Sequence, residues 1–265
     1  MNVLFIGDLV GRRAVALVRD LLPALRSEHA AEFVVVNVEN ASGGFGVNAR
    51  TVEEMLAAGV DVMTTGNHVW DNKEIVPILA SGEAPVIRPA NLNPAVPGRG
   101  WLTVTSTGGR QLTVVNLVGR LFMNPVDDPF RVADEILAGV PPPVLVDFHA
   151  EATSEKIAFG HYLDGRVAAV IGTHTHVQTA DERVLPGGTA YLTDAGMTGP
   201  VDGVIGMDAT SVLHRFRTGM PARFKVAEGA QLLCGVVVTI ADRSATGIRR
   251  LRIPVAVPES TSNGP

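Results

Sequence analysis

Residues 2–40, NVLFIGDLVGRRAVALVRDLLPALRSEHAAEFVVVNVEN, decide the fold class. Two short runs rich in β-branched residues, 2–8 and 32–40, flank a segment at 12–30 whose apolar residues recur at helical spacing. Two strands joined by a crossover helix pair in parallel. The stretch therefore predicts a β-α-β unit and a fold built on a largely parallel sheet.

The same alternation continues along the chain and then changes to antiparallel patterns. The next expected elements are a helix, a strand, a helix, a hairpin, a helix, a strand, a helix and a strand, at residues 48–59, 60–68, 71–82, 100–119, 128–139, 142–149, 152–165 and 167–174. We expect Asp71 to cap the helix that follows it. Residues 230–257 predict antiparallel strands. We expect one domain over residues 1–255, with mixed sheets flanked by helices, and a flexible tail over 256–265.

Composition and charge exclude several classes of protein. The 265 residues are 46% hydrophobic and 18% charged, which suits a fold whose central strands are covered on both faces. The formal net charge is -5, so a broad basic surface for duplex nucleic acid or for an anionic membrane is not expected. A small anionic substrate would need local positive charge, and metal ions could supply it.

The cellular location is predicted from cysteine usage and from the lack of long apolar runs. The single cysteine, Cys234, cannot form an internal disulfide, which fits a reducing compartment. No run approaches the ~18 apolar residues of a membrane-spanning helix, and Asp8 interrupts the N-terminal apolar stretch. We therefore expect a cytoplasmic protein that does not enter a membrane.

Side chains that can bind metal ions follow each strand of the expected parallel sheet. They are Asp8, Glu39 with Asn40, Asn67 with His68, His149, and His174 with His176. The carboxyl ends of parallel strands border the crevice in which open α/β sheets bind ligands. Taken singly, each has an ordinary alternative as a helix cap, a turn residue or a half-buried hydrogen-bonded histidine; Asp8, for example, could cap the helix that follows it. Five successive strand ends of this kind nevertheless favour a metal site over coincidence.

The stretch VAAVIGTHTHVQTA, residues 167–180, contains two of these candidates one residue apart. Side chains two apart on an extended chain point to the same side. We therefore expect His174 and His176 to direct both imidazoles into one space, which is an arrangement typical of metal ligands.

The types of side chain in this set indicate which metals to expect. No cysteine takes part, so a thiolate zinc site is excluded, whereas carboxylate, carboxamide and imidazole ligands suit manganese, iron or zinc. Even without His68, the other seven candidates are too many for one ion. Two ions about 3.5–4 Å apart, bridged by a carboxylate, would use all seven and would form the pair of metals found in phosphoester hydrolysis.

Five motifs in the chain resemble the calcineurin-like metallophosphoesterase superfamily, and most closely its YmdB-type bacterial phosphoesterases. They are IGDLVG, NVENASGGFG, TTGNHVWD, VDFHAEATSEK and GTHTHVQTADE, and the resemblance runs from residue 2 to about residue 255. It implies a four-layer α/β/β/α fold in which two mixed β-sheets are sandwiched between α-helices. It also implies a cytoplasmic enzyme that hydrolyses 2',3'-cyclic nucleotides.

Two departures from the commoner superfamily pattern are shared with the YmdB-type group. The usual Asp-x-His becomes Asp8-Leu9-Val10, and the usual Gly-Asp becomes Glu39-Asn40. The resemblance implies that the asparagine fills the missing histidine's place. It thus assigns Asp8, Asn40 and His176 to one metal, Asn67, His149 and His174 to the other, and Glu39 to a bridge between them. A neutral oxygen ligand in place of a histidine suits iron or manganese more than zinc.

The predicted mechanism is metal-assisted hydrolysis of a phosphodiester. The two ions would lower the pKa of a shared water, and the resulting hydroxide would attack phosphorus. His68 is the expected general acid for the leaving oxygen, and its alternative role is to orient a metal ligand. Phosphomonoesterase or nuclease activity on the same metals, or a non-catalytic nucleotide-binding regulator, are the alternatives. The expected partners are a small phosphodiester substrate and further copies of the chain in a homo-oligomer.

Several other features of the sequence allow an ordinary structural role beside a functional one. The glycine-rich stretch at 39–48 could bind phosphate through its amides or could simply be a turn. Residues 191–208 could close over the site as a flap or could be a plain connection. Asp194 is expected in a turn or a helix cap. His29, His161 and His214 lie within segments of helical spacing and are expected to be surface or packing residues.

Overall fold

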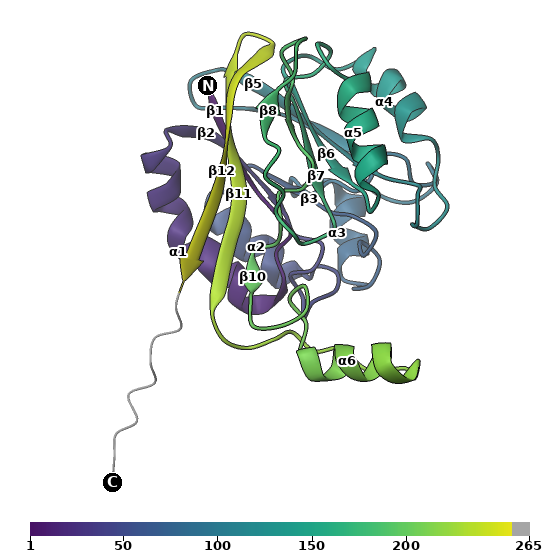
Figure 1. Ribbon diagram of the computed structural model, residues 1–265. Coiled ribbons are helices and arrows are strands. Elements are labelled where there is room, and N and C mark those ends of the chain that lie inside the picture. The colour runs from purple at the N-terminus through teal and green to yellow at the C-terminus, as the bar shows by residue number, and fades with distance from the viewer. Residues whose placement is uncertain (256–265) are drawn as a thin grey trace.

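Two mixed six-stranded sheets lie face to face in the computed structural model, which describes residues 1–255 (Figure 1). The first sheet has the order β10-β11-β1-β2-β3, with β12 also paired to β11; these strands are Gly199–Pro200, Gln231–Ala241, Asn2–Ile6, Ala31–Asn37, Val62–Thr64 and Ser244–Val255. The second sheet has the order β4-β5-β6-β7-β9-β8; these strands are Trp101–Thr105, Gln111–Val118, Val144–His149, Ala169–Thr173, Ala190–Leu192 and Arg183–Val184. The predicted β-α-β unit is confirmed, because β1 and β2 pair in parallel.

Five helices cover the outer faces of the two sheets. Helices α1 (Gly11–Glu28), α2 (Ala49–Ala57) and α3 (Ile75–Ser81) pack on the first sheet. Helices α4 (Pro129–Leu137) and α5 (Thr153–Tyr162) pack on the second sheet. The predicted four-layer α/β/β/α architecture is therefore confirmed.

Strand alternation explains why the sequence forms layers. On β2, Phe33 and Val35 face the second sheet and join the core between the sheets, whereas Val34 and Val36 face the helices. All four are almost fully buried. Burying a side chain of this size contributes about 1.5–3 kcal/mol, so both faces of the strand favour the layered arrangement. A strand covered on both faces appears in the sequence as a continuous apolar run.

Helix α6 (Ala209–Thr218) contains His214, which the sequence places in a segment of helical spacing, and its end signals are present. The Asp208 side chain accepts a hydrogen bond from Ser211 N at 3.0 Å, and Gly219 ends the helix with a φ of 70°. Its apolar residues do not form one buried stripe, since Leu213 and Phe216 are exposed. In Figure 1 the helix projects at the lower right, away from both sheets.

The tail predicted over 256–265 lies outside the described residues. The short strands β8 and β10 were not expected. Among residues 1–255, no helix has the length and apolar character needed to cross a membrane.

Candidate metal centre

All seven predicted metal ligands lie together, at or just beyond the carboxyl ends of strands from both sheets. Asp8, Glu39 with Asn40, and Asn67 follow β1, β2 and β3 of the first sheet. His149 ends β6, and His174 and His176 follow β7 of the second sheet. The two sheets therefore each contribute about half of the candidate centre.

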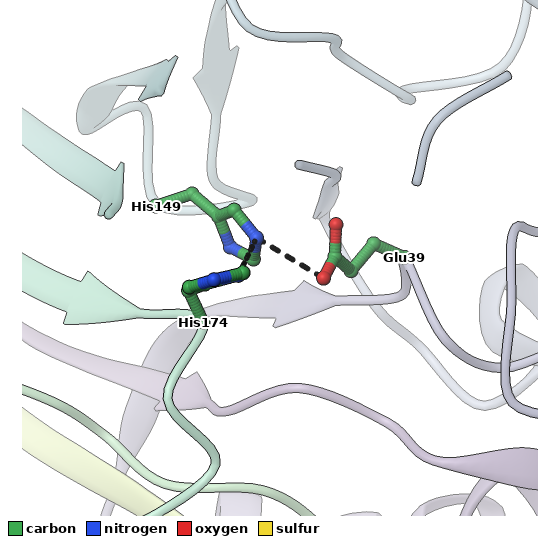
Figure 2. Close-up of side chains that lie close together, drawn as sticks. All are labelled: Glu39, His149 and His174. Atoms are coloured by element: carbon green, nitrogen blue, oxygen red, sulfur yellow. Dashed lines mark hydrogen bonds and ion pairs between the residues drawn. The ribbon is translucent and has the colours of Figure 1, made fainter. Parts of the chain in front are cut away.

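One group of donor atoms converges on the His149 imidazole. Its Nε2 lies 3.0 Å from Glu39 Oε1, 2.9 Å from Asn67 Oδ1 and 3.1 Å from His174 Nδ1. Figure 2 shows His149, His174 and Glu39 pointing toward one another from separate chain segments. These atoms are close enough together to coordinate one ion.

A second group shares Glu39 with the first. Donor atoms of Asp8, Glu39 and His176 all lie within 4.8 Å of one another, and Asn40 Nδ2 lies 3.0 Å from His176 Nε2. Glu39 therefore belongs to both groups of donor atoms. The assignment of the two groups to separate ions stays a prediction.

The burial and chemistry of these residues fit bound metal ions. Asp8 and Glu39 are both almost completely buried. Asp8 Oδ1 and Asn40 Oδ1 are buried without a hydrogen-bond partner among the described residues. Buried oxygen atoms without partners are costly, and a cation would satisfy them. The oxygen and nitrogen donors suit iron, manganese or zinc.

The two histidines of the His-x-His motif reach the centre by a different route from the one expected. Strand β7 ends at Thr173, and His174 and His176 have φ angles of 99° and 66°. Strand alternation is therefore the wrong reason for their shared direction. Left-handed conformations of L-residues are uncommon and cost on the order of 1–2 kcal/mol each. Hydrogen bonds hold the loop, among them His174 N to Asp8 Oδ2 at 3.1 Å.

A buried ion pair between Lys156 and Asp194 also holds the loop that carries His174 and His176. Lys156 Nζ donates to Asp194 Oδ2 at 2.6 Å and to the Thr173 carbonyl at 2.7 Å. Asp194 also accepts from Thr175 N and Oγ1 at 3.1 and 2.8 Å. The turn role expected for Asp194 is confirmed by its bond from Gly196 N, but the ion pair with Lys156 was missed. A lysine on a helix gives no sequence signal that it will be buried.

A second buried acid orients the His149 ring. His149 Nδ1 lies 2.9 Å from Thr173 Oγ1, which donates to Asp147 Oδ1 at 2.6 Å. This chain of hydrogen bonds leaves Nε2 directed at the other donor atoms. Asp147 was not predicted, although a single acid inside the apolar run VLVDFH was a usable signal.

Burial and neighbouring charges shift the pKa values of the metal-free centre. Burial alone would raise the pKa of Glu39, but the positive charge and hydrogen bond of His149 lower it to about 2. Burial alone would lower the pKa of His149, but Glu39 raises it to about 9. Burial raises the pKa of Asp8 well above its ordinary value. Burial, assisted by the charge of His149, lowers the pKa of His174 to about 3.

His68 lies beside the centre and is held by an aspartate. Its Nδ1 lies 2.8 Å from Asp71 Oδ2, and its backbone N donates to Glu39 Oε2 at 3.2 Å.

Asp71 does not cap the following helix as expected, because α3 begins at Ile75. Asp8 does not cap its helix either: Val10 is the first residue before α1, and it forms no side-chain cap. Both aspartates contact the site instead.

Gly66, in the Gly-Asn-His motif, is required by close packing inside the centre. A Cβ atom at this position would overlap Glu39 Oε2 and the His149 ring. Any larger residue would displace the Glu39 carboxylate from the position shared by the two groups of ligands.

The centre borders a pocket of about 470 Å³. Glu39, Asn40, His68, His174 and His176 line the part next to the centre. Most of the remaining lining is apolar and comes from residues within 204–224. His176 Nδ1 lies 2.9 Å from the Ile205 carbonyl. The stretch at 191–208, for which a flap and a plain connection were both possible, therefore contacts a candidate ligand.

The three remaining histidines lie away from this pocket, as expected. His29 is buried, and its Nδ1 lies 3.1 Å from Arg249 Nη2. His161 and His214 are exposed on helices α5 and α6.

Comparison with known proteins shows strong similarity over almost the whole chain. A relative from Bacillus subtilis, named 2',3'-cyclic-nucleotide 2'-phosphodiesterase, is 47% identical over 257 residues, which are 96% of each chain. A crystal structure of a protein from Thermus thermophilus superimposes with a TM-score of 0.92 at 42% identity, covering 96% of this chain and 100% of that one.

Two further comparisons agree with these. A crystal structure described as a novel phosphatase from Mycoplasma pneumoniae superimposes with a TM-score of 0.91 at 33% identity and covers 97% of this chain and 95% of that one. The family described as YmdB-like protein matches residues 4–251. The chain therefore belongs to the YmdB-like protein family.

Proposed function

We propose that this chain is a phosphodiesterase that uses two metal ions to hydrolyse 2',3'-cyclic nucleotides. The observation that carries the proposal is the pair of donor groups that share the buried Glu39 carboxylate and open into a pocket. The relative from Bacillus subtilis supports the substrate, since its name specifies a 2',3'-cyclic nucleotide and it is 47% identical.

The proposed ligands divide between the two ions as the two donor groups do. Asp8, Asn40 and His176 would hold one ion, and Asn67, His149 and His174 would hold the other. Glu39 would be shared between them. Iron or manganese is the proposed metal, with zinc as the alternative, because the set is rich in oxygen and contains no thiolate.

When bound, such a metal pair lowers the pKa of a water and neutralises negative charge on the phosphoryl oxygens. His68 lines the same pocket and is proposed to donate a proton to the oxygen that leaves phosphorus. Asp71 accepts from Nδ1 of His68, which keeps Nε2 available for that proton. In a 2',3'-cyclic nucleotide cut as the relative's name states, the leaving oxygen is O2', and the product is a 3'-phosphate.

The chain's own residues keep this geometry rigid. The Asp147–Thr173–His149 hydrogen bonds fix one ligand, and the Lys156–Asp194 pair fixes the loop that carries two more. Preorganised ligands need no rearrangement when substrate binds, which favours catalysis over binding alone.

The direct test combines metal analysis with hydrolysis assays on purified protein. Wild type is expected to carry about two iron or manganese ions per chain and to cleave 2',3'-cAMP faster than 3',5'-cAMP or a phosphate monoester. Glu39→Gln is expected to lose metal and activity together. The exposed Glu83→Gln is the matched control and is expected to keep both.

Two outcomes would contradict the proposal. Glu39→Gln with wild-type turnover would remove the metal bridge from the mechanism. If wild-type protein stayed inactive after reconstitution with each metal, hydrolysis would be excluded and the chain would be a nucleotide-binding protein. The cytoplasmic location and the homo-oligomer stay predictions from the sequence.

A further inference from the structure

We propose that the aromatic lining of the pocket, formed by Phe45, Phe216 and Phe224 with Arg215, binds the nucleobase of the substrate. The inference rests on the proposed function, because it assigns the apolar part of the pocket to the base of the nucleotide whose phosphodiester the metal centre is proposed to bind. It concerns residues outside the metal centre, and none of them was singled out from the sequence.

The pocket is chemically divided. Its part next to the centre is polar, with Glu39, His68 and His174 among the lining residues. The rest contains three phenylalanines with Val204, Ile205 and Met207. A 2',3'-cyclic nucleotide is divided in the same way, since an anionic phosphodiester and a flat, largely apolar base are attached to one ribose. A phosphodiester held at the centre therefore leaves the base within reach of the apolar lining.

The aromatic groups are arranged as surfaces on which a base could stack. Arg215 places its guanidinium 5.3 Å from the centre of the Phe224 ring, and Phe45 packs edge-on against His68 at 5.2 Å. Phe216 is 80% exposed although it lines the pocket. An exposed phenylalanine gains most by covering its ring with another apolar surface. Aromatic rings and arginine planes are common stacking partners of unpaired bases.

This lining is held at a fixed place relative to the metal centre. The Ile205 carbonyl lies 2.9 Å from Nδ1 of the candidate ligand His176. Phe45 and Phe224 pack on a small buried cluster that includes Met197 and Met207. The distance between the phosphate-binding and base-binding parts is therefore set by the fold and not left to a free loop.

The volume of the pocket agrees with a single nucleotide. About 470 Å³ lies within the range of ordinary small-molecule sites. Arg215 also supplies only hydrogen-bond donors, so it can pair with the oxygen and ring-nitrogen acceptors that bases carry at their edges.

The test compares two substrates that differ only in the base. These are 2',3'-cAMP and the 2',3'-cyclic phosphate of 1-O-methylribose, each assayed with wild-type, Phe216→Ala and Leu213→Ala protein reconstituted with manganese. Leu213 is an exposed apolar residue on α6 that does not line the pocket, so it is the matched control. We expect wild type to prefer 2',3'-cAMP. Phe216→Ala should reduce kcat/KM for 2',3'-cAMP about tenfold or more relative to the base-free substrate.

A binding measurement provides a second readout that does not depend on turnover. Calorimetry of adenosine 3'-monophosphate and ribose 3-phosphate should show tighter binding of the nucleotide to wild type, and this preference should shrink in Phe216→Ala but not in Leu213→Ala. Equal kcat/KM for the two substrates in wild type, or an unchanged preference in Phe216→Ala, would overturn the base site. Preferential nucleotide binding without hydrolysis of either substrate would support the base site and overturn the proposed catalysis instead.

Discussion

Replacing Lys156 with Met should strongly destabilise the chain. Lys156 and Asp194 are both almost completely buried, and the lysine donates at 2.6 and 2.7 Å. Met has a similar length but leaves the Asp194 carboxylate buried without its cation. Removing one partner of a buried ion pair costs about 3–5 kcal/mol in the free energy of unfolding. For a chain of this size, that loss lowers Tm by about 6 °C or more.

Urea denaturation and thermal melting of metal-free protein would measure this effect without a contribution from metal binding. The exposed Lys73→Met is the matched control and should change stability by less than about 0.5 kcal/mol. Adding Asp194→Asn to Lys156→Met should recover part of the loss, because it removes the uncompensated charge. A loss below about 1 kcal/mol for Lys156→Met, or a double variant as unstable as the sum of the two single ones, would refute the reasoning.

Three further predictions follow from the site and the core. His68→Ala should keep its metal but lower kcat for 2',3'-cAMP about 10²–10⁴-fold, with a smaller loss on bis-p-nitrophenyl phosphate, whose leaving group needs no proton; equal losses on both substrates would argue against the acid role. The pKa of about 9 for His149 in the metal-free chain means that metal binding at pH 7 displaces its proton, so metal affinity should rise with pH up to about 9. Calorimetry in two buffers of different ionisation enthalpy would detect the released proton, and a heat that does not depend on the buffer would contradict this. Burial raises the pKa of Cys234 to about 11, so iodoacetamide at pH 8 should label it only after unfolding, as mass spectrometry would show; rapid labelling of the native chain would contradict its burial.

The sequence predicted the parallel unit and the candidate ligands because both depend on local pattern. Apolar runs and helical spacing mark the strands and the helices between them, and side chains such as Asp8 and His149 stand where those runs end. A polar residue at a strand end can be recognised without knowing what lies opposite. Helical spacing around His214 indicated a helix there, but the exposed Leu213 and Phe216 of α6 provide no buried face that would show where the helix packs.

Only the tertiary structure decided which residues meet. Asp8 accepts a hydrogen bond from His174 N although 166 positions separate them, and Asn37 reaches Asp147 across 110 positions. Three other features likewise depend on loops that follow different strands. They are the burial of Lys156, the left-handed turns at His174 and His176, and the contact of Ile205 with His176. The physical reason is that these contacts form where two sheets pack face to face, and local spacing along the chain carries no information about that packing.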